Sequence, residues 1–258
     1  ISVLHDKMAE LSSQLEAGEL RNADGGKITD IIHIGIGGSD LGPVMIYEAL
    51  QAIGTSSVKA HFFANVDPSF MRQKLAQINP RSTLVIVVSK SFATAETLSN
   101  AKFIKQWMLD SGLSRSYCEQ RFYAVTANVN KAVEFGIESQ QILPMWDWVG
   151  GRFSVWSGVS LVLVMVFGMP CFKQLLAGAY AMDQHFRYAP FSQNMPVIMG
   201  LLGVWYGNFL QAPTQAVIPY SEYLRAFPDY LQQLHMESLG KHVDREGNPL
   251  TLLTGRIL

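Results

Sequence analysis

Short apolar runs alternate with stretches of helical spacing from the N-terminus to residue 145. The runs that are typical of β-strands cover residues 31–36, 59–64, 83–88 and 122–126, and a shorter apolar run follows at 141–143. Helical spacing predicts helices over residues 1–20, 43–52, 68–77, 131–135 and a stretch that ends near 109. Strands that alternate with helices indicate βαβ units and a mainly parallel sheet. Because the runs are continuously apolar, we expect helices on both faces of this sheet.

The pattern changes after residue 152. Helical spacing predicts helices over residues 156–176, 179–187, 196–210 and 227–241. The run at 215–220 is expected to be a strand that opens a second sheet. We therefore expect a first α/β domain over 1–190 and the start of a second over 191–258. The chain opens with Ile1 and stops at Leu258 without a terminal helix or tail, so we expect that both ends are truncated.

The composition narrows the class of protein. Hydrophobic residues make up 48% of the chain and charged residues 16%, which is typical of a well-packed globular protein. The formal net charge is −1, which argues against a nucleic-acid partner. The longest apolar stretch, 159–166, is shorter than the ~20 residues of a membrane span, so we expect no membrane segment. Cys118 and Cys171 lack metal-ligand spacing, so we expect no metal. We expect both to be free thiols in a cytoplasmic protein, with a single disulfide between them as the alternative.

The first predicted strand runs into the glycine-rich segment Gly35-Ile36-Gly37-Gly38-Ser39-Asp40. Glycines after a strand let backbone amides approach an anion, and the N-terminus of a following helix favours negative charge. A tight structural turn explains the same glycines equally well, so both interpretations stay open. The dinucleotide fingerprint GxGxxG is only partly met, because Asp40 stands where the third glycine is required. A nucleotide-dependent oxidoreductase is therefore disfavoured, and we expect no cofactor.

A cluster of hydroxyl residues follows the third predicted strand, in the segment Ser89-Lys90-Ser91-Phe92-Ala93-Thr94. Hydroxyls, helix N-terminal amides and a lysine together suit a phosphate group. The alternative is a serine that caps an ordinary helix start. The Walker pattern is absent from this segment, so a nucleoside triphosphate site is not indicated.

Two further segments carry candidate chemistry. Arg152 follows two glycines, and a guanidinium held in this way stabilises a developing oxyanion without accepting a proton. Residue types alone favour a structural ion pair between Arg152 and Asp147. Gln233, Glu237 and Lys241 share one face of the predicted helix at 227–241, where Glu237 is a candidate general base. Spacing alone favours an exposed Glu237–Lys241 pair.

The segments GIGGSDLGP, SKSFATAET, DWVGGRFSVWS and QQLHMESLGK occur in this order, and together they resemble the phosphoglucose isomerase family almost from end to end. The resemblance implies an α/β fold of the sugar-isomerase (SIS) type, a three-layer αβα sandwich. It also implies reversible aldose–ketose isomerisation of glucose 6-phosphate to fructose 6-phosphate through an enediolate, in glycolysis and gluconeogenesis.

The resemblance assigns roles to residues at matching positions. It implies substrate contacts for Gly38 and Ser39 in the sugar pocket, for Ser89, Lys90, Ser91 and Thr94 at the phosphate, and for Gln233. Glu237 is implied as the base that moves a proton between C2 and C1. Arg152 is implied to stabilise the enediolate, and Glu96 to support the ring-opening histidine.

The family's ring-opening histidine comes from the partner subunit of a homodimer. The block that carries it and the block that carries a C-terminal lysine are not found in these 258 residues. We therefore expect this chain alone to bind a sugar phosphate weakly and not to isomerise it at a normal rate. A non-catalytic sugar-phosphate-binding SIS module is the alternative, but the joint presence of Arg152 and Glu237 favours the isomerase.

Overall fold

The computed structural model describes residues 1–54 and 56–257. The chain divides into two compact units, residues 1–172 and 173–258. This division falls within helix α8 (Met169–Tyr188). The sequence-based domain boundary at residue 190 stays a prediction.

A five-stranded parallel sheet organises the first unit. Its strands are β1 (Asp30–Ile34), β2 (Lys59–Phe63), β3 (Thr83–Val88), β4 (Phe122–Thr126) and β5 (Ile142–Pro144). They lie in the order β2-β1-β3-β4-β5, and every neighbouring pair is parallel. The central strand β3 is buried along its whole length, as its unbroken apolar sequence predicts. The four predicted strands and the parallel α/β fold are confirmed, and the short apolar run at 141–143 contributes to the fifth strand, β5.

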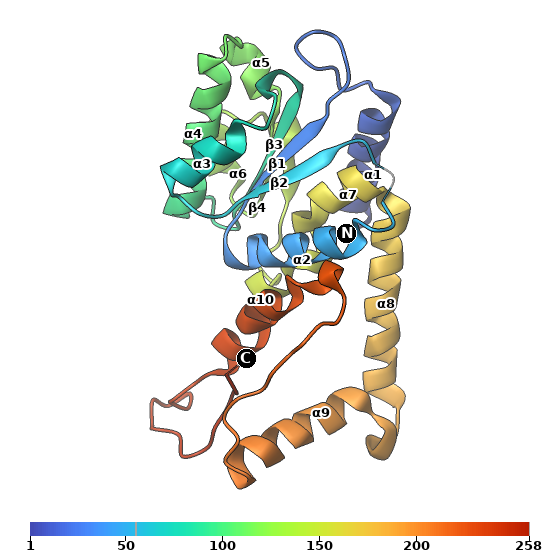
Figure 1. Cartoon of the computed structure of the whole chain (residues 1–258), viewed down its shortest axis with the longest axis vertical. Coiled ribbons are helices and arrows are strands. Elements are labelled where there is room, and N and C mark those ends of the chain that lie inside the picture. The colour runs from blue at the N-terminus through green and yellow to red at the C-terminus, as the bar shows by residue number, and fades with distance from the viewer. Residues whose placement is uncertain (55, 258) are drawn as a thin grey trace. The chain divides into compact units, whose positions relative to one another are not determined.

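Helices cover both faces of this sheet (Figure 1). The helices of the first unit are α1 (Ser2–Ala17), α2 (Leu41–Leu50), α3 (Pro68–Leu75), α4 (Ala95–Asp110), α5 (Arg115–Glu119), α6 (Val129–Glu134) and α7 (Leu161–Phe167). Buried side chains of α3, α4, α5 and α6 form one core with alternate residues of β1, β3 and β4. Helices α1 and α7 pack together on the other face, where α7 also contacts β2. The short helix α5, which Ser114 caps by accepting from the Tyr117 amide (3.2 Å), is not among the predicted elements.

Local sequence signals fix where these helices begin and end. The Asp67 carboxylate accepts hydrogen bonds from the amides of Ser69 (2.8 Å) and Phe70 (3.4 Å), so it caps α3, and Pro68 occupies the first helical position. Such a cap stabilises a helix by about 1 kcal/mol. The continuous helix predicted over 156–176 is wrong, because Gly168 adopts φ +84° and separates α7 from α8. A left-handed residue of this kind suits glycine and interrupts the helix.

The second unit is mainly helical in the part that the structure describes. It contains most of α8, then α9 (Met195–Val204), α10 (Phe227–Leu231) and two π-helical turns, Trp205–Phe209 and Gln232–Glu237. The strand predicted at 215–220 is wrong, because the segment is irregular and only Thr214 forms an isolated bridge, to Ile257. An apolar run without a neighbouring strand cannot satisfy its backbone by sheet pairing.

Two expectations drawn from the composition, one on the cysteines and one on membrane-spanning segments, can be compared with the described residues. Cys118 and Cys171 are both free thiols, so the disulfide alternative is wrong. Across the described residues, none of the helices combines the length and the apolar character that crossing a membrane requires.

Candidate active site

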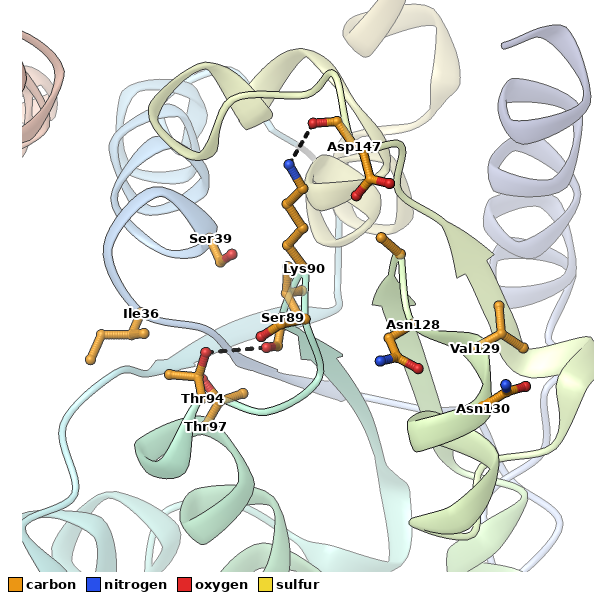
Figure 2. Close-up of a pocket in the computed structure, with 13 residues that line it drawn as sticks. Ile36, Ser39, Ser89, Lys90, Thr94, Thr97, Asn128, Val129, Asn130 and Asp147 are labelled. Atoms are coloured by element: carbon orange, nitrogen blue, oxygen red, sulfur yellow. Dashed lines mark hydrogen bonds between the residues drawn. The ribbon is translucent and has the colours of Figure 1, made fainter. Parts of the chain in front are cut away.

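A cavity of about 760 Å³ opens at the carboxyl edge of the sheet, where ligands of parallel α/β sheets bind. Segments that follow β1, β3, β4 and β5 line it, so four separate loops converge at one place (Figure 2). The lining residues belong to the first unit: Ile36, Ser39, Val88, Ser89, Lys90, Ser91, Thr94, Thr97, Ala127, Asn128, Val129, Asn130 and Asp147.

The hydroxyl segment after β3 forms a tight loop on the cavity wall. The Ser89 amide donates to the Val125 carbonyl (3.2 Å), and the Phe92 amide donates to the Ser89 carbonyl (3.1 Å). Phe92 has φ +46° and its side chain is buried, so packing holds the loop in a conformation that a non-glycine residue rarely adopts. The Ser89 and Thr94 hydroxyl oxygens lie 3.3 Å apart, which gathers two donors at one point.

Helix α4 begins at this loop and points its N-terminus at the cavity edge. Thr94 is the N-cap residue, but its side chain accepts no hydrogen bond from the helix amides. The N-cap of α4 is therefore not a serine, so the serine-cap alternative is wrong, and Thr94 and Ser91 both line the cavity. Free amides at a helix start and the helix dipole both favour an anion.

Lys90 reaches across the cavity rim. Its ammonium donates to the backbone carbonyl of Asp147 (2.6 Å) and, at longer range, to that of Val149 (3.3 Å). Figure 2 shows the Lys90 side chain extended from the loop toward Asp147. The lysine thus joins the loop after β3 to the segment that leads to Arg152.

Glycines allow the loop after β1 to touch this same segment. A Cβ atom on Gly38 would lie 2.1 Å from the Gly151 carbonyl oxygen, and one on Gly35 would lie 2.5 Å from the Ser39 carbonyl oxygen. The Ser154 hydroxyl donates to the Gly38 carbonyl (2.9 Å) and locks the contact. Close backbone packing therefore explains Gly35 and Gly38, while Ser39 faces the cavity.

Arg152 lies half-buried in a 3₁₀ turn, with its guanidinium 4.7 Å from the centre of the Phe153 ring. Among the described residues it forms no ion pair with Asp147, so the structural ion pair that residue types favoured is wrong. A guanidinium without a carboxylate partner is available to interact with an anionic ligand.

Two buried titratable groups lie beneath the loop after β1. Burial lowers the pKa of His33 to about 4, although its hydrogen bond to the Ser39 carbonyl (2.7 Å) acts in the opposite direction. The ring is therefore neutral at pH 7, and its Nε2–H donates to that carbonyl. Burial raises the pKa of Asp40 to about 7, against the attraction of the Lys74 ammonium. One oxygen of Asp40 has no hydrogen-bond partner among the described residues.

Three further residues of the cavity wall carry polar groups, beyond the residues to which the sequence assigned roles. Thr97 is buried and its hydroxyl has no partner within the described structure. Asn128 faces the cavity from the loop after β4, while its side chain accepts from the Lys131 amide (3.2 Å) and caps α6. Asn130 follows it. Their position after successive parallel strands was the available signal, since such loops share one edge of the sheet.

The remaining predicted residues lie elsewhere. Glu96 is exposed in the first turn of α4. Gln233 and Glu237 belong to the second unit, where Glu237 is exposed and accepts a hydrogen bond from the Ser238 hydroxyl (2.7 Å). They lie in a π-helical turn, and Lys241 follows the end of the helix, so the predicted i, i+4, i+8 face is wrong. The roles of Glu96, Gln233 and Glu237 stay predictions.

A family model described as phosphoglucose isomerase matches residues 1–258. The chain belongs to the phosphoglucose isomerase family. It is 47% identical over 252 residues to glucose-6-phosphate isomerase of Shewanella pealeana and 49% identical over 252 residues to that of Marinomonas sp.. Each match covers 98% of this chain and 46% of the relative, so the chain spans about half the length of the curated relatives it matches.

Solved structures agree with this family assignment. The crystal structure of a glucose-6-phosphate isomerase from Chlamydia trachomatis superposes with a TM-score of 0.85 at 35% identity, covering 98% of this chain and 47% of that one. A hypothetical protein from Thermus thermophilus gives a TM-score of 0.75 at 31% identity, with 98% and 58% covered. The family resemblance and the isomerase-type α/β fold are thus confirmed.

Proposed function

We propose that this chain supplies the phosphate-binding and sugar-binding part of a glucose-6-phosphate isomerase, together with three of its catalytic side chains, Arg152, Glu237 and Glu96. The observation that carries the proposal is the cluster of hydroxyls at the start of α4, inside the cavity of a chain that belongs to this family. The proposed reaction is the reversible aldose–ketose isomerisation of glucose 6-phosphate and fructose 6-phosphate, a step of glycolysis and gluconeogenesis.

The substrate phosphate is proposed to bind at the loop after β3. Ser89, Ser91 and Thr94 supply hydroxyl donors, and the first amides of α4 supply backbone donors where the helix dipole is positive. Lys90 has three N–H donors, of which two contact carbonyls, so one is left for the phosphate. Binding energy gained at this remote group positions the reacting carbons.

The sugar is proposed to lie between this loop and Arg152. Gly38 and Ser39 are proposed to bound its pocket, which Ser39 lines in the structure, and Gln233 is proposed to contact the sugar. Removal of a proton next to a carbonyl leaves negative charge on oxygen, which a fixed guanidinium such as that of Arg152 stabilises. A single carboxylate, Glu237, removes the proton from C2 and returns it to C1. Glu96 is proposed to support the histidine that opens the sugar ring. None of these steps calls for a cofactor.

Assembly is part of the same proposal. The family resemblance implies a cytoplasmic homodimer in which the partner subunit supplies the ring-opening histidine. Since that histidine block and the family's C-terminal lysine block are not found in these 258 residues, we expect this chain alone to bind sugar phosphate without normal turnover. A non-catalytic sugar-phosphate-binding module would need neither Arg152 nor Glu237.

Thermal unfolding with 6-phosphogluconate tests the proposal directly on this chain. A ligand that binds only the folded state at 100 times its Kd stabilises it by about 2.7 kcal/mol, so we expect a clear rise in Tm. Phosphate-free gluconate and NAD(H) are the matched controls and leave Tm unchanged. A rise with NAD(H) alone would contradict the proposal and favour a nucleotide-binding protein.

A further inference from the structure

The Lys90 ammonium makes two contacts that the binding of a phosphate group alone does not require. It is committed to two backbone carbonyls, those of Asp147 (2.6 Å) and Val149 (3.3 Å), although both belong to a different loop. Among the described residues it has no carboxylate partner. A half-buried ammonium that spans two loops in this way acts as a cross-link between them.

The near end of this cross-link is rigid. The Lys90 carbonyl accepts from the Ala127 amide (3.0 Å) and from the Thr126 hydroxyl (3.1 Å). The preceding Ser89 amide is bonded to the Val125 carbonyl of β4 (3.2 Å). The backbone of Lys90 is therefore fixed to the end of the buried strand β4.

The far end is a turn that leads to Arg152. The Val149 amide donates to the Trp146 carbonyl (3.0 Å) and closes the turn. On one side, the rings of Trp146 and Trp148 stack with centres 5.4 Å apart and planes 12° apart. After the turn come two glycines, the most flexible residues of a chain, and then Arg152. The Gly151 carbonyl packs against Gly38, so the loop after β1 holds the segment at the arginine, and the Lys90 ammonium holds it at the preceding turn.

We propose that Lys90 is a positioning residue for Arg152. Its ammonium holds the carbonyls of Asp147 and Val149, and so keeps the arginine segment in place beside the anion site. The third N–H of the ammonium remains for the ligand. The same ammonium therefore contacts both the anion and the segment that carries Arg152. The inference rests on the proposed function only in calling that anion a sugar phosphate.

Hydrogen exchange of residues 146–152 tests this role without any assay of turnover. Lys90→Met keeps the length of the side chain and removes its donors, so we expect these amides to exchange about tenfold faster or more. Lys90→Arg can reach two carbonyls with its forked donors, and we expect it to restore most of the protection. Ser91→Ala, which removes a proposed phosphate hydroxyl but no contact to the turn, leaves exchange unchanged.

The stacked indoles provide a second readout. Trp146 and Trp148 flank Asp147, so the coupled circular-dichroism signal of the pair should weaken in Lys90→Met and return in Lys90→Arg. Exchange and indole signals that stay at the parent values in a folded Lys90→Met chain overturn the proposal. If that variant does not fold, ¹⁵N NMR of the parent decides: a slowly exchanging Lys90 ammonium supports the cross-link, and a fast-exchanging one overturns it.

Titration with 6-phosphogluconate separates this inference from the proposed function. Faster exchange at 146–152 in Lys90→Met supports the positioning role even if the parent chain binds no ligand. A parent chain that binds no ligand would contradict only the proposed anion site. Ligand binding by the parent with no effect of Lys90→Met on the segment refutes the positioning role and leaves the anion site standing.

Discussion

Gly38 and Gly151, which are 113 positions apart in the sequence, lie in direct backbone contact, because a Cβ on Gly38 would lie only 2.1 Å from the Gly151 carbonyl oxygen. The contact brings the loop after β1 against the segment that carries Arg152. The Ser154 hydroxyl, which donates to the Gly38 carbonyl (2.9 Å), closes the same junction.

Gly38→Ala should therefore destabilise the first unit by about 2–4 kcal/mol, since neither backbone can yield without moving a loop. Urea unfolding measures the change. Gly151→Ala is the matched control from the other side of the junction, because its Cβ would meet nothing within 4 Å, and we expect a change below about 0.5 kcal/mol. Equal costs for the two variants would contradict the asymmetry of this contact.

Thr94→Ala should weaken binding of 6-phosphogluconate by about tenfold or more, because a hydrogen bond to a charged group is worth about 1.5–3 kcal/mol. Thr94→Ser keeps the hydroxyl and should bind nearly as the parent does. Calorimetric titration gives the dissociation constants. The control is Ser99→Ala, an exposed serine on the same helix. Unchanged affinity in Thr94→Ala would remove this residue from the proposed phosphate site.

Asp40 and His33 should give opposite pH dependences of stability. Asp40 has a pKa raised from 3.8 to about 7, so between pH 4 and 7 the folded chain binds more protons at this residue and stability falls as pH rises. His33 has a pKa lowered from 6.5 to about 4, so its contribution is present above pH 6.5 and is lost as pH falls toward 4.

Asp40→Asn replaces the buried carboxyl with a neutral group of the same shape. We expect the stability of this variant relative to the parent to increase steadily from pH 4 to pH 7. Denaturant unfolding at several pH values measures the difference, and the variant itself should become less stable below pH 6.5 because of His33. A difference that does not vary with pH would show that Asp40 titrates as an ordinary aspartate.

Thr97→Val should leave stability unchanged or raise it by up to about 1 kcal/mol, because the buried Thr97 hydroxyl has no partner among the described residues. The matched control is Thr83→Val, which removes a buried hydrogen bond to the Asn79 carbonyl (2.6 Å) and should cost about 1 kcal/mol. Thermal unfolding compares the two. A clear loss of stability in Thr97→Val would contradict this expectation, because it would show that the Thr97 hydroxyl makes a hydrogen bond that stabilises the unliganded protein.

Glu237→Gln should lower kcat by about 10²–10⁴-fold if this carboxylate is the base, because it removes the group that carries the proton. The measurement needs an isomerase of the relatives' full length that contains this sequence, assayed with fructose 6-phosphate. Affinity for 6-phosphogluconate should change little. Glu246→Gln, at an exposed carboxylate of the same unit, is the control. A variant with normal kcat would exclude Glu237 as the base.

The strands and their parallel direction could be predicted from the sequence because β1, β3 and β4 lie in mainly apolar runs that are buried on both faces. The run at 83–88 predicts β3 to the residue. The run at 215–220 has the same local character but no neighbouring strand in the described structure, and it stays irregular. Strand formation depends on a partner, which local sequence cannot specify.

By itself, the sequence determined the family, the apolar runs of the sheet and the residue types of the candidate site. Tertiary structure decided which of those residues meet. It placed Gly38 against Gly151, left Arg152 without the ion pair that residue types favoured, and turned the Lys90 ammonium toward the carbonyls of Asp147 and Val149. The physical reason is that these contacts join loops far apart in the chain, and the packing of the sheet fixes their distances.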